Sequence, residues 1–173
     1  MYLPKHFEQH DREQLIELMR ARPLATLITI TADGPSADLI PMEFIPDEGE
    51  HGTLRGHVAR ANPLWRRAGT TALAVFTGPE AYISPGWYAS KKEHGKVVPT
   101  WNYTMVQARG VLRAVDDAQW LHALVNRLTN RHEATQTTPW QVGDAPDDYV
   151  QQMLRAIVGI EIPLTSLVGK WKI

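Results

Sequence analysis

The chain has 173 residues, of which 43% are hydrophobic, and 18 basic and 19 acidic side chains give it a net charge of −1. This length fits one domain that buries roughly 70% of its unfolded surface. The absence of cysteine excludes disulfides, thiolate zinc sites and cysteine nucleophiles. No apolar run is long enough to cross a bilayer and the first residues do not form a signal peptide, so we expect a soluble, cytoplasmic protein.

A short helix followed by strands is predicted for the first two-thirds of the chain. Asp11 is placed to cap a helix of about residues 11–21, and Pro23 ends it. Asp33-Gly34 is a strong β-hairpin signal. Alternating and β-branched residues predict strands at residues 24–31, 36–45, 53–58, 71–77 and 101–115.

Three further segments connect these strands. Asn62-Pro63 predicts the start of a short helix, because Asn is a preferred cap and Pro is favoured at the first helical position. Gly78-Pro79 predicts a turn. The lysine-rich residues 84–96 contain glycine and proline, and we expect them to form a mobile loop with Lys91 at its rim.

Two helices are predicted over about residues 116–158. Asp116 is expected to cap the first, and the second is expected to begin near Pro146. Each has an apolar stripe that should be buried: Trp120, Leu121, Leu124, Val125 and Leu128 in the first, and Tyr149, Val150, Met153, Leu154 and Ile157 in the second. A last strand is expected at residues 159–164, followed by a tail to residue 173.

This order of elements predicts a single domain over residues 1–173, mainly β with peripheral helices. Strands come first and helices cluster late, which is typical of an antiparallel barrel with helices packed outside. The chain has no G-x-G-x-x-G run after a strand, so a doubly wound dinucleotide-binding fold is not expected.

The segment Gly56–Trp65 contains donors suited to a phosphate. His57 and Arg60 precede the predicted helix start at Asn62-Pro63. Helix N-termini present free N–H groups and a partial positive charge, both of which favour a dianion. The alternative reading of these residues is an ordinary capped surface helix with surface arginines.

Five of the six tryptophans lie outside any helical stripe. Aromatic residues in such positions tend to line ligand sites or subunit interfaces. The five are Trp65, Trp87, Trp101, Trp140 and Trp171. Seven histidines also raise the possibility of a metal site, but no His-x-x-x-His pair or Glu-x-x-His repeat is present, so none is predicted.

Four long motifs in this order and spacing resemble the PaiB-like family, also called FMN-binding negative transcriptional regulators. They are GHVARANPLW at 56–65, AYISPGWYASK at 81–91, VPTWNY at 98–103 and GKWK at 169–172. The resemblance extends over essentially the whole chain. It implies an FMN-binding split β-barrel, related in fold to pyridoxamine-phosphate oxidases, that forms a homodimer with flavin at the subunit interface.

By the same resemblance, the first motif would carry the phosphate side of FMN and the VPTWNY motif the ring side. The residues expected to bind the cofactor are His57, Arg60, Ala61, Asn62, Lys91, Trp101, Asn102, Tyr103, Lys170 and Trp171. No catalytic residue is identified, because any chemistry would be that of the flavin. The family name implies DNA binding, but the balanced charge and the lack of a reading helix do not support it.

Three functions remain open from the sequence. The first is a flavin- or redox-linked regulator of the PaiB type. The second is a flavin-dependent oxidoreductase that acts on a small molecule. The third is a haem-binding split barrel, which would need an axial ligand such as His94 or His132.

Overall fold

The computed structural model describes all 173 residues, and an antiparallel nine-stranded sheet dominates it. The strands are β1 (Glu8–Gln9), β2 (Leu24–Thr31), β3 (Gly34–Pro41), β4 (Glu43–Ile45), β5 (Thr53–Ala59), β6 (Thr71–Ile83), β7 (Thr100–Val111), β8 (Arg113–Val115) and β9 (Ile157–Lys172). The helices are α1 (Arg12–Ala21), α2 (Ser90–His94), α3 (Ala118–Glu133) and α4 (Asp147–Arg155).

Strand β9 connects the two parts of the sheet, because it pairs with β7 on one side and with β5 on the other. Its first half pairs with β5 and β8, and its second half pairs with β7 and β1. The order β3-β2-β6-β7-β9-β5-β4 brings β3 and β5 close together without a hydrogen-bond ladder between them. A Cβ added at Gly56 of β5 would lie 3.0 Å from the Pro41 carbonyl oxygen of β3. We call this unpaired approach of β3 and β5 the seam.

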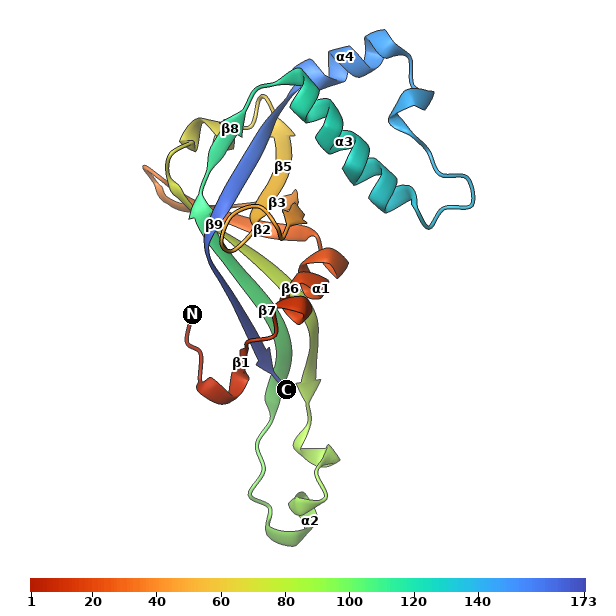
Figure 1. Cartoon of the computed structure of the whole chain (residues 1–173). Helices are drawn as coiled ribbons and strands as arrows, with labels where there is room; N and C mark the ends of the chain where they lie inside the picture. Colours follow the sequence, from red (N-terminus) through yellow and green to blue (C-terminus); the bar gives the residue numbers. More distant parts are fainter.

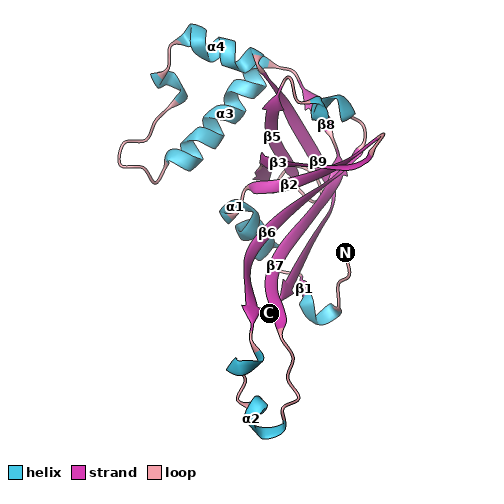
Figure 2. Ribbon diagram, turned by 180° about the vertical axis from the view of Figure 1, so that it is seen from behind, coloured by secondary structure: helices cyan, strands magenta, loops and turns pink.

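The core fills the inside of this curved sheet. Leu27, Phe76, Val106 and Ile160 come from four different strands, and none of them is exposed. Helix α1 covers one opening with Leu15, Leu18 and Met19. Figures 1 and 2 show α3 and α4 outside one end of the sheet, and the β6–β7 arm reaching to the opposite end, where α2 forms its tip.

Several predicted boundaries are confirmed. Asp11 caps α1 through the Glu13 N–H at 2.9 Å, and the β2–β3 hairpin turns before Gly34. Residues 84–96, expected as a loop, instead contain a short 3-10 helix and α2. The strand expected at 36–45 is interrupted at Met42, whose side chain is buried, so it forms β3 and β4.

The predicted turn at Gly78-Pro79 is wrong. Strand β6 continues to Ile83, and its pairing with β7 only shifts register between Thr77 and Glu80. Gly78 is needed there because a Cβ would lie 2.8 Å from Leu18 and closer still to the Thr104 hydroxyl. Glycine therefore permits close packing in a bulged strand rather than a reversal of the chain.

Two predictions about the last third are also wrong. The last strand does not stop at Leu164, because β9 continues to Lys172 by pairing with β7. Asp117, and not Asp116, caps α3 by accepting the Trp120 N–H at 2.6 Å. None of the four α-helices combines the length and the apolar character that a membrane-spanning helix needs.

Three of the five residues in the buried stripe predicted for α3 are buried, whereas most of the stripe predicted for α4 is not buried. Leu121, Leu124 and Leu128 of α3 pack inward. In α4 only Leu154 is buried, whereas Tyr149 and Met153 keep 52% and 40% of their surface exposed. These two side chains face a hollow rather than the core.

Candidate functional site

His57 occupies the meeting point of three hollows on the outside of the barrel. Along β5, Leu54 and Val58 point into the core, so the alternating His57 and Ala59 point outward beneath α3 and α4. The Nδ1 atom of His57 is buried and has no hydrogen-bond partner. Burial lowers the pKa of His57, and the imidazole is therefore neutral at neutral pH.

The first hollow is a seam pocket of about 400 Å³ between β3 and β5. Its walls are apolar, with Asp38, His57 and Asn62 as the polar side chains. The residues that line it are Asp38, Leu39, Ile40, Pro41, His57, Val58, Ala59, Asn62 and Ile157. Two polar residues of the phosphate motif, His57 and Asn62, thus lie in one pocket.

Asn62 has the predicted capping role. Its side-chain oxygen accepts the Leu64 N–H at 2.9 Å, and its amide nitrogen donates to Asp38 at 3.1 Å. The helix that it caps is a five-residue 3-10 helix, Pro63–Arg67. Both polar ends of the Asn62 side chain are therefore engaged, and the neighbouring Asp38 places a negative charge in the seam pocket.

Arg60 forms a clamp between β5 and the two late helices. Its guanidinium donates to both carboxylate oxygens of Asp116, at 2.6 and 2.8 Å, and to the carbonyls of Arg155 and Ile157. The hydrogen bond from Arg60 holds the pKa of Asp116 below its usual value. All three guanidinium nitrogens are engaged, so Arg60 would have to leave these partners to contact a phosphate fully.

The second group of predicted residues lies in the β7 and β9 arm. Trp101, Asn102 and Tyr103 begin β7, and the register pairs Tyr103 with Lys172 and Met105 with Lys170. These directly opposed residues share one face of the sheet.

Lys170 is only 6% exposed, although no carboxylate pairs with it. Its Nζ donates to the Tyr2 carbonyl at 3.0 Å and lies 5.3 Å from the centroid of the Tyr103 ring. Trp171 points to the opposite face, where it packs against the core, and Lys91 lies in α2 at the tip of the arm. The two motifs do not meet within one chain, because the seam and the arm tip lie at opposite ends of the molecule (Figure 1).

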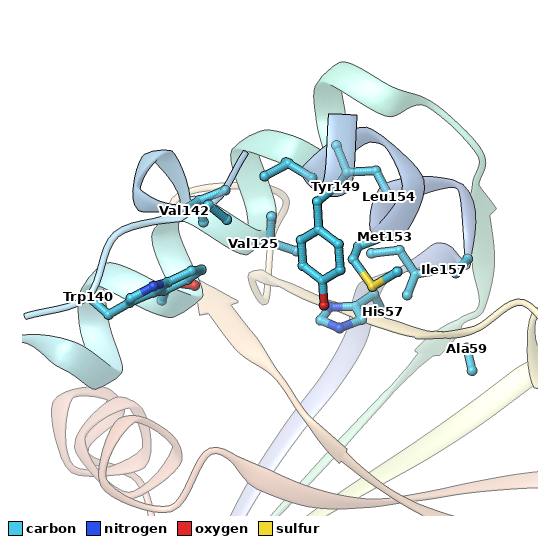
Figure 3. Close-up of a pocket in the computed structure, with 13 residues that line it drawn as sticks. His57, Ala59, Val125, Trp140, Val142, Tyr149, Met153, Leu154 and Ile157 are labelled. Atoms are coloured by element: carbon cyan, nitrogen blue, oxygen red, sulfur yellow. The ribbon is translucent and has the colours of Figure 1, made fainter. Parts of the chain in front are cut away.

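A second hollow, which we call the helical pocket, was not predicted from the sequence. It has a volume of about 400 Å³ and lies between His57 of β5 and the α3–α4 hairpin (Figure 3). Eleven of its 13 lining residues are hydrophobic, and they include Val125, Trp140, Tyr149 and Met153. Two features of the sequence point to this pocket. Trp140 lies outside any helical stripe, and the apolar stripe of α4 contains more residues than the one, Leu154, that is buried.

The two candidate haem ligands lie far from each other. His132 borders a third hollow, which also contains His57 and Trp140. His94 is at the arm tip, where its Nδ1 accepts the Lys96 N–H at 3.0 Å.

An antiparallel split barrel with outer helices and a hollow at the unpaired seam is the architecture expected of a small flavin-binding barrel, and comparison with known proteins supports this class. The chain matches the family described as "Putative FMN-binding domain" over residues 1–166. It belongs to that family. The expected PaiB-like relationship and FMN as the cofactor of the family are thereby confirmed.

Relatives of known sequence align over most of their length. An uncharacterized protein of Emericella nidulans is 32% identical over 210 residues, covering 99% of this chain and 83% of that protein. "Protease synthase and sporulation protein PAI 2" of Bacillus subtilis is 28% identical over 175 residues, covering 100% of this chain and 81% of that protein.

Solved structures confirm the predicted fold. The FAD and heme binding protein from Mycobacterium smegmatis has a TM-score of 0.71 at 17% identity, covering 95% of this chain and 73% of that one. "Putative Pyridoxamine 5'-phosphate oxidase" from Listeria innocua has a TM-score of 0.51 at 13% identity, covering 90% and 94%. The split barrel related to pyridoxamine-phosphate oxidases is therefore the observed architecture.

Proposed function

We propose that the chain binds FMN in the seam pocket and acts as a flavin- or redox-linked regulator of the PaiB type. The observation that carries the proposal is the partnerless Nδ1 of His57 beside the hollow formed by the phosphate motif. A buried polar atom without a partner costs free energy, and a ligand with a polar edge would satisfy it. A bound flavin would supply electron or hydride transfer to the site.

The residues present fit such a ligand in two respects. Leu39, Pro41 and Ile157 offer apolar walls, and the neutral His57 can hydrogen-bond to the polar edge of a ring system. The seam pocket lacks a free positive charge for the FMN phosphate. Asp38 would repel an anion, and the guanidinium of Arg60 is paired with Asp116. Lys170 and Lys172 carry charge without a carboxylate partner, but they lie on the arm, away from the seam of the same chain.

A homodimer would bring the arm of one chain to the seam of the other. The outer face of β2 and β3 supports this arrangement, because Ile30 and Leu39 are 62% and 67% exposed on it. Large exposed apolar patches mark interaction surfaces. Leu39 also lines the seam pocket, so the pocket adjoins the face that a second chain would cover.

A titration with FMN and riboflavin tests the proposal. We expect FMN to quench its fluorescence on binding with one molecule per chain, and riboflavin to bind at least about tenfold more weakly because it lacks the phosphate. Equal affinity for the two flavins would show that the protein does not recognise the phosphate. No binding of either would overturn the proposed function.

The second candidate is a flavin-dependent oxidoreductase, and the helical pocket beside the seam is the observation that favours it. Bleaching of bound flavin by a nicotinamide cofactor, followed by turnover with a small-molecule acceptor, would support the enzyme. Bleaching without turnover would favour the regulator.

A further inference from the structure

The helical pocket has the properties of a small-molecule site in its own right. Its volume of about 400 Å³ falls within the range of roughly 300–1,000 Å³ that is typical of ligand pockets. No Lys, Arg, Asp or Glu side chain lines it. An ionic ligand would lose its hydration there without gaining a partner, so the walls select against charge.

Aromatic and flexible side chains remain exposed at this pocket instead of collapsing into it. Trp140 keeps 47% of its surface exposed, beside the half-exposed Tyr149 and Met153. Planar aromatic surfaces and a methionine form favourable contacts with an aromatic ligand. In Figure 3 the Tyr149 ring points toward His57, across the hollow from Trp140.

The segment that carries Trp140 is held in place before any ligand binds. The Trp140 N–H donates to the Glu133 carboxylate at 3.1 Å, at the end of α3. The next residue, Gln141, donates its N–H to Asp144 at 2.8 Å. This pocket wall is therefore preorganised, which lowers the entropic cost of binding.

Polar side-chain atoms in the pocket are few, and they have no partners within the chain. The hydroxyls of Thr129 and Tyr149 both belong to lining residues, and neither hydroxyl hydrogen-bonds to another residue of the chain. His57 forms a wall common to the helical pocket and the seam pocket. A molecule in the helical pocket would therefore lie next to whatever occupies the seam.

We propose that the helical pocket binds a small, uncharged aromatic molecule with one hydrogen-bonding group, as a second ligand beside the flavin. The position beside the flavin rests on the proposed function, whereas the pocket and its chemistry do not. Such a ligand would be the effector of a regulator or the substrate of an oxidoreductase.

Calorimetric titration with 2-naphthol and 2-naphthalenesulfonate tests this inference. These probes have the same ring system, and they differ in charge. We expect 2-naphthol to bind reversibly and the sulfonate to bind at least about tenfold more weakly, because the pocket offers the anion no cation. Equal affinities, or no binding of 2-naphthol, would overturn the proposal.

Two lysine variants on one helix locate the binding. Met153→Lys places a charge in the pocket and should weaken 2-naphthol binding by about tenfold or more, while FMN binding stays unchanged. Gln152→Lys adds the same charge to the exposed side of α4 and should bind like the wild type. An equal loss in both variants would place the probe elsewhere.

Saturation with FMN separates this inference from the proposed function. We expect 2-naphthol to bind with similar affinity in the presence and absence of FMN. Displacement of the probe by FMN would show that the helical pocket belongs to the flavin and would overturn the second ligand. If 2-naphthol binds as expected and FMN does not bind at all, the pocket stands and the proposed function fails.

Discussion

Arg60 and Asp116 form an ion pair that no pattern in the sequence predicts. The sequence predicts that Arg60 contacts a phosphate. In the structure its hydrogen bonds link the end of β5 to the start of α3 and the end of α4. The two residues are 56 positions apart, so no local pattern could reveal the pair. By contrast, the cap by Asn62 was predictable, because it bonds only two residues along the chain.

Replacing Arg60 by Ala should lower the melting temperature, because four hydrogen bonds to Asp116, Arg155 and Ile157 are lost. Asp116→Ala should have a smaller effect in the same direction. Calorimetry of both variants and the double variant checks the coupling, which should make the double variant about as stable as Arg60→Ala.

A flavin titration of Arg60→Ala then tests whether Arg60 also contacts the FMN phosphate. A rise in the FMN dissociation constant of about 10- to 100-fold, with little change for riboflavin, would assign a phosphate contact to Arg60 as well. A melting temperature equal to the wild type in both single variants would contradict the clamp.

His57 should make the stability of the protein depend on pH. Its folded pKa lies below the ordinary value of about 6.5, so below that pH the unfolded chain binds more protons than the folded one. Stability should therefore fall as the pH drops through 6.5, and the loss should level off only below the folded pKa. Urea unfolding at pH 7.5 and pH 5.5 should show a smaller loss in His57→Gln than in the wild type.

The exposed His10 provides the control for this experiment. His10→Gln should follow the wild type at both pH values. If His57→Gln loses as much stability as the wild type, then protonation of His57 does not limit stability in this range.

Helix α3 packs against β9 through a contact between Trp120 and Gly159 that leaves no room for a side chain at residue 159. A Cβ at Gly159 would lie 2.3 Å from the Trp120 ring and 2.9 Å from the Val115 carbonyl. Gly159→Ala should therefore cost about 1–3 kcal/mol through overpacking. Urea unfolding measures the loss, and Gly143→Ala, where nothing lies within 4 Å, should be nearly neutral.

A second substitution relieves the crowding. Trp120→Leu in the Gly159→Ala background should recover part of the stability, because the smaller side chain leaves room for the added methyl group. Equal losses at Gly159 and Gly143 would mean that Trp120 moves aside without cost.

The elements that the sequence predicted well are those with local signals. Helix α1 has its cap and its stop within a dozen residues, and the β2–β3 hairpin has its Asp33-Gly34 turn. The sequence does not distinguish the bulge at Gly78 from a turn, because glycine favours both. Only the packing of Leu18 and Thr104, on neighbouring elements, decides between them. The length of β9 likewise depends on pairing with β7, which is remote in sequence.

The candidate site was predictable only in part for the same reason. The GHVARAN motif led to His57 and the seam pocket, because a contiguous segment builds one side of it. The helical pocket is lined by residues of β5, α3, α4 and the loop at Trp140. It therefore depends on how α3 and α4 pack against the barrel, which no local pattern in the sequence specifies.

At the scale of the whole molecule, the exposed face of β2 and β3 predicts a dimer. Stable interfaces bury well over about 1,000 Å², and this face offers Leu24, Ile30 and Leu39. Sedimentation should give twice the chain mass of 19.5 kDa. Leu39→Lys should shift the protein toward monomer and weaken FMN binding together, and Gln119→Lys on α3 should do neither. A wild-type monomer at micromolar concentration would contradict the dimer.

The charge of the whole chain argues against direct DNA recognition. With a net charge of −1, the isolated protein should bind duplex DNA weakly and without sequence preference. A gel-shift titration at physiological salt measures this. Nanomolar, sequence-specific binding would overturn it and place the regulatory activity in the chain itself.

The visible spectrum of freshly purified protein, recorded before and after addition of FMN, shows whether the chain is a flavoprotein. We expect the absorption bands of an oxidised flavin, which added FMN should intensify until one flavin is bound per chain and which should be retained on gel filtration. A Soret band without flavin bands would identify a haem protein of the same fold. A colourless protein whose spectrum shows no bound flavin after addition of FMN would contradict FMN binding by this chain.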